Sequence, residues 1–220
     1  MDFSPFFISL SVSVLATVVT FFLGLLAANR VCKMRKGKGV LDALFTLPMI
    51  LPPTVAGFFL LVAFGRNGFI GRFLYLVGIR VSFTWTGAVI AAIFVSFPLM
   101  YRTARGALEQ IDQNVIHAAQ TLGFSRRKIF WTLQVPMARA GILAGTVLAF
   151  ARALGEFGAT LMFAGGIPGR TQTMAIAVWE AMSAGDMRTA YIWAAILSMM
   201  SFVMMMLMNM NRKRKTKGRG

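Results

Sequence analysis

Residues 117–136 read HAAQTLGFSRRKIFWTLQVP and lie between two long apolar runs. The first half favours a short helix, and Gly123 suits the left-handed conformation that ends many helices. Ser125 can then cap a second helix, whose apolar side chains fall on one face. Pro136 suits the first turn of the next helix, which begins the following apolar run. This stretch therefore predicts a helix–glycine–helix hairpin set between two apolar helices.

The apolar runs around the hairpin define the fold class. The chain has 220 residues, of which 57% are hydrophobic and 14% are charged, whereas soluble domains carry about 25% charged residues. Several runs contain roughly 20 apolar residues, enough to cross a bilayer as a helix. We expect an all-α integral membrane protein in which residues 1–220 form one domain. The five predicted transmembrane helices cover about residues 6–28, 44–64, 84–101, 140–163 and 191–210.

The positions of the cations predict the orientation of these helices. Of the 23 Lys and Arg residues, five lie in residues 30–43, six in 102–139 and six in 211–220. Positively charged loops stay in the cytoplasm. We therefore expect the N-terminus outside, and the C-terminus and the loop at about 107–136 inside. The net charge of +16 follows the ends of the apolar runs, so it indicates contact with membrane lipid and not with nucleic acid.

The residues alone leave two interpretations of the hairpin open. One is an amphipathic loop that lies on the membrane surface. The other is a rigid element that packs onto the helix ends and receives a push from a cytosolic partner. His117 is expected to make a polar surface contact, with a pH-sensitive contact as the alternative.

Neither a metal site nor an enzyme active site is predicted. His117 is the only histidine and Cys32 the only cysteine, and one imidazole makes a poor metal site. The methionines near the C-terminus are nearly contiguous, so they point around a helix instead of converging on one ion. The chain has no P-loop pattern, so we do not expect it to hydrolyse ATP itself.

Two charges within the fourth predicted span are candidates for function, because an isolated charge inside a membrane is costly. Arg152 and Glu156 stand four residues apart, so on a continuous helix they meet on one face. Two roles remain open: an ion pair that holds the structure or a gate, and direct contact with a transported anion. In the second span, Pro52 and Pro53 break the helix, which is tolerated where a segment faces protein or a watery cavity.

The hairpin resembles the EAA loop of permease subunits in binding-protein-dependent ABC importers. That pattern is Glu-Ala-Ala, three residues, glycine, a longer spacer and a terminal Leu-Pro or similar. Ala118, Ala119, Gly123 and Pro136 match it at the expected spacing, whereas His117 stands where the family usually has glutamate and Val135 precedes the proline. The resemblance implies that this segment is a coupling helix, which docks in a groove of a cytosolic ATPase. The implied coupling residues are His117, Ala118, Ala119, Leu122, Gly123, Arg126 and Pro136.

Two further stretches indicate the substrate class. LDALFTLPMILPPTVAGFFLLVAFGRNGFIG (41–71) and LAFARALGEFGATLMFAGGIPGRTQTMAIAVWEAM (148–182) resemble molybdate importer permeases. Sulfate and tungstate permeases share the ARALGEFGA core, but LPPTVAGFFLL, FGRNGFIG and GGIPGRTQT together favour the molybdate branch. The resemblance does not separate tungstate from molybdate. Sulfate or thiosulfate is the alternative substrate, and a passive anion channel is a further alternative that needs no coupling loop.

The family resemblance implies a type I ABC importer permease fold in the cytoplasmic (inner) membrane of a bacterium or archaeon. It implies a homodimer that forms one pathway with two cytosolic ATPase subunits and one extracytoplasmic molybdate-binding protein. The chain itself is expected to bind no cofactor, since ATP and Mg²⁺ belong to the ATPase. Residues assigned to the pathway or its gate are Pro52, Pro53, Thr54, Arg152, Glu156 and Thr160.

An electropositive outer mouth is expected from the arginines on the other side of the membrane. It would steer the anion or dock an acidic binding protein, with a purely topological loop as the alternative. The residues assigned to binding-protein docking are Arg66, Gly169 and Arg170, and Arg72 and Arg80 add to the positive charge.

Overall fold

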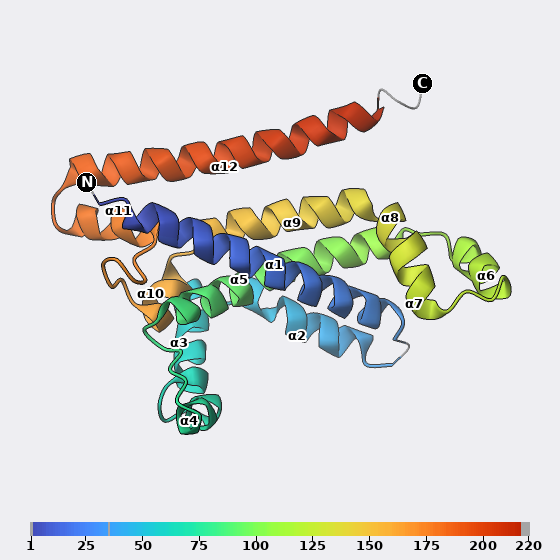
Figure 1. Ribbon diagram of the computed structural model, residues 1–220, viewed down its shortest axis with the longest axis horizontal. Helices are drawn as coiled ribbons and strands as arrows, with labels where there is room; N and C mark the ends of the chain where they lie inside the picture. Colours follow the sequence, from blue (N-terminus) through green and yellow to red (C-terminus); the bar gives the residue numbers. More distant parts are fainter. Residues whose placement is uncertain (1, 35, 217–220) are drawn as a thin grey trace.

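The computed structural model describes the backbone of residues 2–34 and 36–216, and this part of the chain is helical, with no strand (Figure 1). Three helices are long and apolar enough to cross a membrane, and two bent helix pairs raise the number of candidate spans to five. The three are α1 (Ser4–Cys32), α5 (Trp85–Glu109) and α12 (Met187–Thr216). The others are α2 (Lys38–Ile50), α3 (Pro53–Phe64), α4 (Phe69–Leu76), α6 (Gln113–Thr121), α7 (Arg126–Ile129), the π-helical turn η1 (Phe130–Gln134), α8 (Val135–Met137), α9 (Arg139–Leu154), α10 (Gly158–Ala164) and α11 (Met174–Ser183).

α5 lies at the centre of the bundle and packs against both α1 and α9 (Figure 1). Small residues on its buried face let the helix backbones approach closely. Across the contact with α1, the hydroxyl oxygens of Thr20 and Ser96 lie 3.3 Å apart. Gly24 of α1 permits this closeness, because a Cβ there would lie 2.8 Å from Cγ of Met100. The buried small residues of α5 include Ala88, Ala91, Ala92, Ser96 and Ala104.

The second predicted span, residues 44–64, is broken into α2 and α3, whose axes differ by 113°. Leu51 is extended, as the residue before a proline usually is. Pro52 and Pro53 have no N–H donor, so α2 cannot continue through them, and α3 begins at Pro53. α3 therefore leaves the bundle sideways and forms a projecting arm with α4 (Figure 1). We define the arm as residues 53–84.

The expectation of one continuous helix over residues 140–163 is wrong. α9 ends at Leu154 and α10 begins at Gly158, because the Glu156 side chain bonds to the backbone of the next turn and starts a new helix there. Pro136 is also not in the first turn of a long span. It lies in α8, after the wide turn η1, and a 77° bend separates this segment from α9.

α10 packs across α3, and two glycines permit this contact. A Cβ at Gly57 would lie 2.8 Å from both Cα and the carbonyl oxygen of Ala159. A Cβ at Gly158 would lie 3.0 Å from Cβ of Pro53. The break between α2 and α3 therefore lies beside the break between α9 and α10.

α12 lies along the outside of the bundle, where it contacts α11 and α9 (Figure 1). Trp193 is buried in a cluster with Phe150 and Met174. Met199 and Met206 are exposed, at 68% and 53%. The uncovered apolar surface of α12 is suited to contact with lipid.

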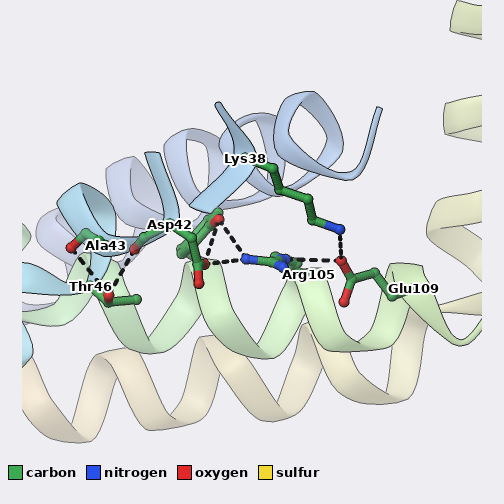
Figure 2. Close-up of polar contacts among 7 residues, drawn as sticks. Lys38, Asp42, Ala43, Thr46, Arg105 and Glu109 are labelled. Atoms are coloured by element: carbon green, nitrogen blue, oxygen red, sulfur yellow. Dashed lines mark hydrogen bonds and ion pairs between the residues drawn. The ribbon is translucent and has the colours of Figure 1, made fainter. Parts of the chain in front are cut away.

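A polar network joins α2 to the C-terminal half of α5 (Figure 2). Arg105 is at its centre: its guanidinium forms an ion pair with Asp42, and its Nε donates to Glu109 over 3.0 Å. Nζ of Lys38 lies 2.7 Å from the same Glu109 oxygen. The Tyr101 hydroxyl donates to Asp42 over 3.0 Å. Because α2 has no fully buried residue, we infer that this network fixes α2 to α5.

Replacing Gly57 with alanine is expected to destabilise the protein by about 1–3 kcal/mol, because the new methyl group overlaps the backbone of α10. Gly106→Ala in α5 is the matched control, since no atom lies within 4 Å of its added Cβ and alanine favours a helix. The measurement is the midpoint of thermal unfolding in detergent. Equal midpoints for the two variants would show that α3 and α10 do not pack in this way.

Arg105→Ala is expected to loosen α2, at a cost of about 1–2 kcal/mol, because Asp42 and Glu109 lose a shared partner. Arg102→Ala is the control: Arg102 is also on α5, is exposed, and belongs to no ion pair in the part of the chain that the structure describes. Hydrogen–deuterium exchange of the α2 peptide should accelerate in the first variant alone. Unchanged exchange would contradict the role of the network.

Candidate functional site

The predicted hairpin is formed by α6 and α7, and it projects at one end of the bundle (Figure 1). α6 begins at Gln113, earlier than the sequence suggested, because the Asp112 side chain accepts from the backbone N–H of Asn114 over 2.9 Å. Gly123 has a φ of 81°, which confirms its predicted left-handed turn. The Ser125 hydroxyl accepts from the N–H of Lys128 over 3.3 Å, which confirms its predicted cap.

The residues predicted to couple to an ATPase do not all face outward. Ala119 is buried, with 5% exposure, so it holds the hairpin together and is not available to a partner. Pro136 is exposed but lies in α8, away from the turn. Leu122 is the most exposed large apolar residue of the hairpin, with 75% exposure. The other exposed members of the predicted set are His117, Ala118, Gly123 and Arg126.

A cleft of about 730 Å³ separates the hairpin from the ends of α1, α2 and α5. His117 and Arg126 line it from the hairpin, and Lys33 lines it from the end of α1. Nζ of Lys33 lies 5.6 Å from the centroid of the Phe130 ring. Partial burial, and then the nearby Arg126 guanidinium, lower the pKa of Lys33. Because Lys38 of α2 also lines this cleft, the hairpin and the start of α2 face each other across it.

The two intramembrane charges meet, as the sequence predicted, but not on one helix. Nη1 of Arg152 lies 2.5 Å from Oε2 of Glu156, and Glu156 lies beyond the end of α9. Oε1 of Glu156 accepts from the N–H of Ala159 over 2.7 Å, and so it caps α10. Apart from the ion pair, Oε2 has no hydrogen-bond partner among the described residues. Glu156 is 2% exposed, whereas the Arg152 side chain is 33% exposed.

The structure brings the six predicted pathway residues to the two adjacent helix breaks. Pro52, Pro53 and Thr54 are exposed at the start of α3. Thr160 is buried one turn after the Glu156 cap, in α10, which packs on α3. Helix breaks in a membrane leave backbone groups that protein or a water-filled cavity must satisfy. At these breaks Glu156 is held inside the protein, whereas Arg152 reaches its surface.

The predicted docking residues lie in two different places. Gly169 and Arg170 are exposed on the loop between α10 and α11, and Gly169 has a φ of 71°. Buried Thr171 fixes this loop, because its hydroxyl donates to the carbonyl of Gly165 over 3.0 Å. Arg66 belongs to the arm, where its Cζ lies 5.1 Å from the centroid of the Tyr75 ring.

The network around Arg105 was missed in the sequence, although its spacing gave a signal. Tyr101, Arg105 and Glu109 follow one another at intervals of four, which places them on one face of α5. Lys38 and Asp42 have the same spacing on α2. Each face carries one positive and one negative side chain, so the two faces can form ion pairs with each other. The sequence does not show, however, that α2 and α5 pack together.

The chain matches the family described as "Binding-protein-dependent transport system inner membrane component" over residues 20–217. The molybdenum transport system permease protein ModB of Escherichia coli (strain K12) is 48% identical over 174 residues, covering 78% of this chain and 76% of that protein. ModB of Haemophilus influenzae is 41% identical over 210 residues, covering 93% and 92%. The sulfate transport system permease protein CysW of Synechococcus elongatus is 35% identical over 199 residues, covering 90% and 70%.

Solved structures show the same fold. A chain of the MetNI methionine ABC transporter in an inward-facing conformation superposes with a TM-score of 0.76 at 14% identity, covering 96% of this chain and 94% of that one. This likeness confirms the expected type I ABC importer permease fold. The chain therefore belongs to the family of binding-protein-dependent transport system inner membrane components, as a multi-pass permease.

Proposed function

We propose that this chain is the membrane-spanning permease subunit of an ATP-driven importer for molybdate or tungstate. The observation that carries the substrate class is its greater similarity to the two ModB proteins than to the sulfate permease CysW. Molybdate and tungstate have the same charge and tetrahedral shape, so one set of cationic and hydrogen-bonding groups suits both. Sulfate or thiosulfate is the alternative substrate, and it would need the same set of groups.

The hairpin is proposed to dock on a cytosolic ATPase, which would hold the ATP and Mg²⁺. Its tip exposes Leu122 and Phe124 beside three consecutive cations, residues 126–128, and residues 113–136 contain no carboxylate. Short connections join the hairpin to α5 and α9, so a push on it reaches both helices. A passive anion channel would have no use for this element. Uptake without ATP would favour that alternative.

The complete importer is proposed to contain two copies of this chain, two ATPase subunits and one extracytoplasmic molybdate-binding protein. The hairpin and the C-terminus would lie in the cytoplasm, and the arm and the N-terminus outside, because most cations flank the hairpin end of the apolar helices. High affinity for the anion would belong to the binding protein, since a permease must release what it carries.

The pathway is proposed to run past the two adjacent helix breaks. There Glu156 caps α10 and holds Arg152 by an ion pair, so a shift of α9 against α10 changes the position of one guanidinium at the pathway wall. The main role proposed for this ion pair is to hold the gate. Contact between Arg152 and the anion is the alternative role.

ATP hydrolysis by this chain assembled with its ATPase in liposomes is expected to rise when the binding protein carries molybdate or tungstate. Ala118→Leu obstructs an exposed face without altering the core, and Gly123→Val strains a left-handed turn by about 1–2 kcal/mol. Both should lower this stimulation. Gly39→Leu is the control, at an exposed site where no atom lies within 4 Å of a new Cβ.

Two outcomes of this assay, and one outcome of an anion-uptake measurement in the same liposomes, would contradict the proposal. Stimulation by sulfate alone would move the chain to the sulfate branch. Anion uptake without ATP would make it a channel. Full stimulation in both hairpin variants would mean that the hairpin does not couple the two proteins.

A double-mutant cycle tests the ion pair. Arg152→Gln leaves the buried Glu156 carboxylate unpaired, which costs about 3–5 kcal/mol. Glu156→Gln is expected to cost less, because glutamine keeps an acceptor for the Ala159 N–H and Arg152 is partly exposed. The double variant should recover much of the loss. Thermal unfolding midpoints give the comparison, and equal losses in the two single variants would contradict the assigned roles.

A further inference from the structure

The arm projects from the bundle at a distance from the hairpin (Figure 1), and it contains a small cavity of about 180 Å³. The end of α3, the helix α4 and the loop that follows α4 line it. Its polar lining consists of Arg66, Tyr75, Arg80 and Ser82, and none of its lining residues carries a carboxylate. The cavity is therefore cationic and rich in hydrogen-bond donors.

The cavity forms because two glycines let backbone segments of the arm approach each other closely. A Cβ at Gly68 would lie 2.2 Å from the carbonyl oxygen of Val62, and a Cβ at Gly71 would lie 1.9 Å from that of Gly65. Only residues without a side chain allow α4 to fold back on the end of α3 at this distance. The GRNGFIG motif (65–71) thus has a physical role, because it places Arg66 and Tyr75 on the same cavity.

The other wall of the cavity is anchored to the bundle. Val81 is buried, and its carbonyl oxygen accepts from the Thr84 hydroxyl over 2.5 Å. The N–H of Phe83 donates to the carbonyl of Phe163 in α10 over 3.0 Å. Arg80 therefore projects from a loop that is tied to the C-terminal end of α10.

Two guanidinium groups share one aromatic ring in this cavity. Cζ of Arg66 lies 5.1 Å, and Cζ of Arg80 5.6 Å, from the centroid of the Tyr75 ring. Neither arginine belongs to an ion pair within the ranges that the structure describes. The sequence has no carboxylate between Asp42 and Glu109 to neutralise them. A cation–π contact leaves the N–H donors of an arginine free, and these donors suit the oxygens of an anion.

We propose that this cavity is a binding site for a small doubly charged tetrahedral oxyanion, which the permease uses between release from the binding protein and passage through the gate. The inference rests on the proposed function for its substrate class. Arg66 and Arg80 supply the charge, while the hydroxyls of Tyr75 and Ser82 supply further donors. The two negative charges of the anion offset the charges of the two guanidinium groups. Binding is weak enough for release, because the cavity is open and its arginines are exposed.

The test measures molybdate binding to the permease–ATPase complex in detergent, by equilibrium dialysis without the binding protein. Arg66→Gln and Arg80→Gln should each weaken binding by about tenfold, the cost of one lost hydrogen bond to a charged group. Arg72→Gln is the matched control, because Arg72 is an exposed arginine of α4 that does not line the cavity. Molybdate held by the ATPase subunit adds the same background to every sample.

The outcomes separate this site from the proposed function. Equal binding by all variants, or no binding by the unaltered complex, would overturn the site alone if loaded binding protein still stimulates ATP hydrolysis. Loss of stimulation in the unaltered complex would instead overturn the proposed function. If the Arg66 and Arg80 variants bind molybdate normally but lose affinity for the binding protein, loaded or empty, the cavity receives a protein carboxylate and the proposal fails.

Discussion

The structure depends on satisfying the backbone at two helix breaks within an apolar surrounding. A break leaves N–H and C=O groups without partners, and lipid offers none. Prolines solve part of the problem at the first break, since Pro52 and Pro53 have no N–H to satisfy. At the second break the buried Glu156 carboxylate accepts from the N–H of Ala159 and is balanced by Arg152. Gly57 and Gly158 then let the two broken segments cover each other.

α5 connects these breaks with the hairpin end of the molecule. Its N-terminal end is tied to α10 through the Phe83–Phe163 hydrogen bond, and its C-terminal end holds the Arg105 network and leads into the hairpin. Between them its face is filled with alanines packed on α1. A helix of 25 residues spans roughly 37 Å. α5 therefore connects the hairpin with the arm and with the two helix breaks.

Features that depend on neighbouring residues were predictable from the sequence, and those that depend on packing were not. Gly123 and Ser125 act through the backbone next to them, so the hairpin turn and its second cap were correctly predicted. The meeting of Arg152 and Glu156 was also predicted, but the helix end between them was not, because it needs a side chain that bonds to the following turn. The 113° bend at Pro52 could be expected as a break, whereas its direction follows from contact with α10. The link between Asp42 and Arg105 joins residues far apart in sequence, so only the tertiary structure reveals it.

The arm carries its charge entirely on arginine, and this has a consequence for the environment in which the protein works. Arg66, Arg72 and Arg80 supply this charge, and residues 53–84 contain no carboxylate to offset it. Dissolved salt weakens the potential around these arginines, because its ions shorten the reach of that potential from about 10 Å at 0.1 M to about 3 Å at 1 M. The attraction of any anion to this surface therefore falls as salinity rises.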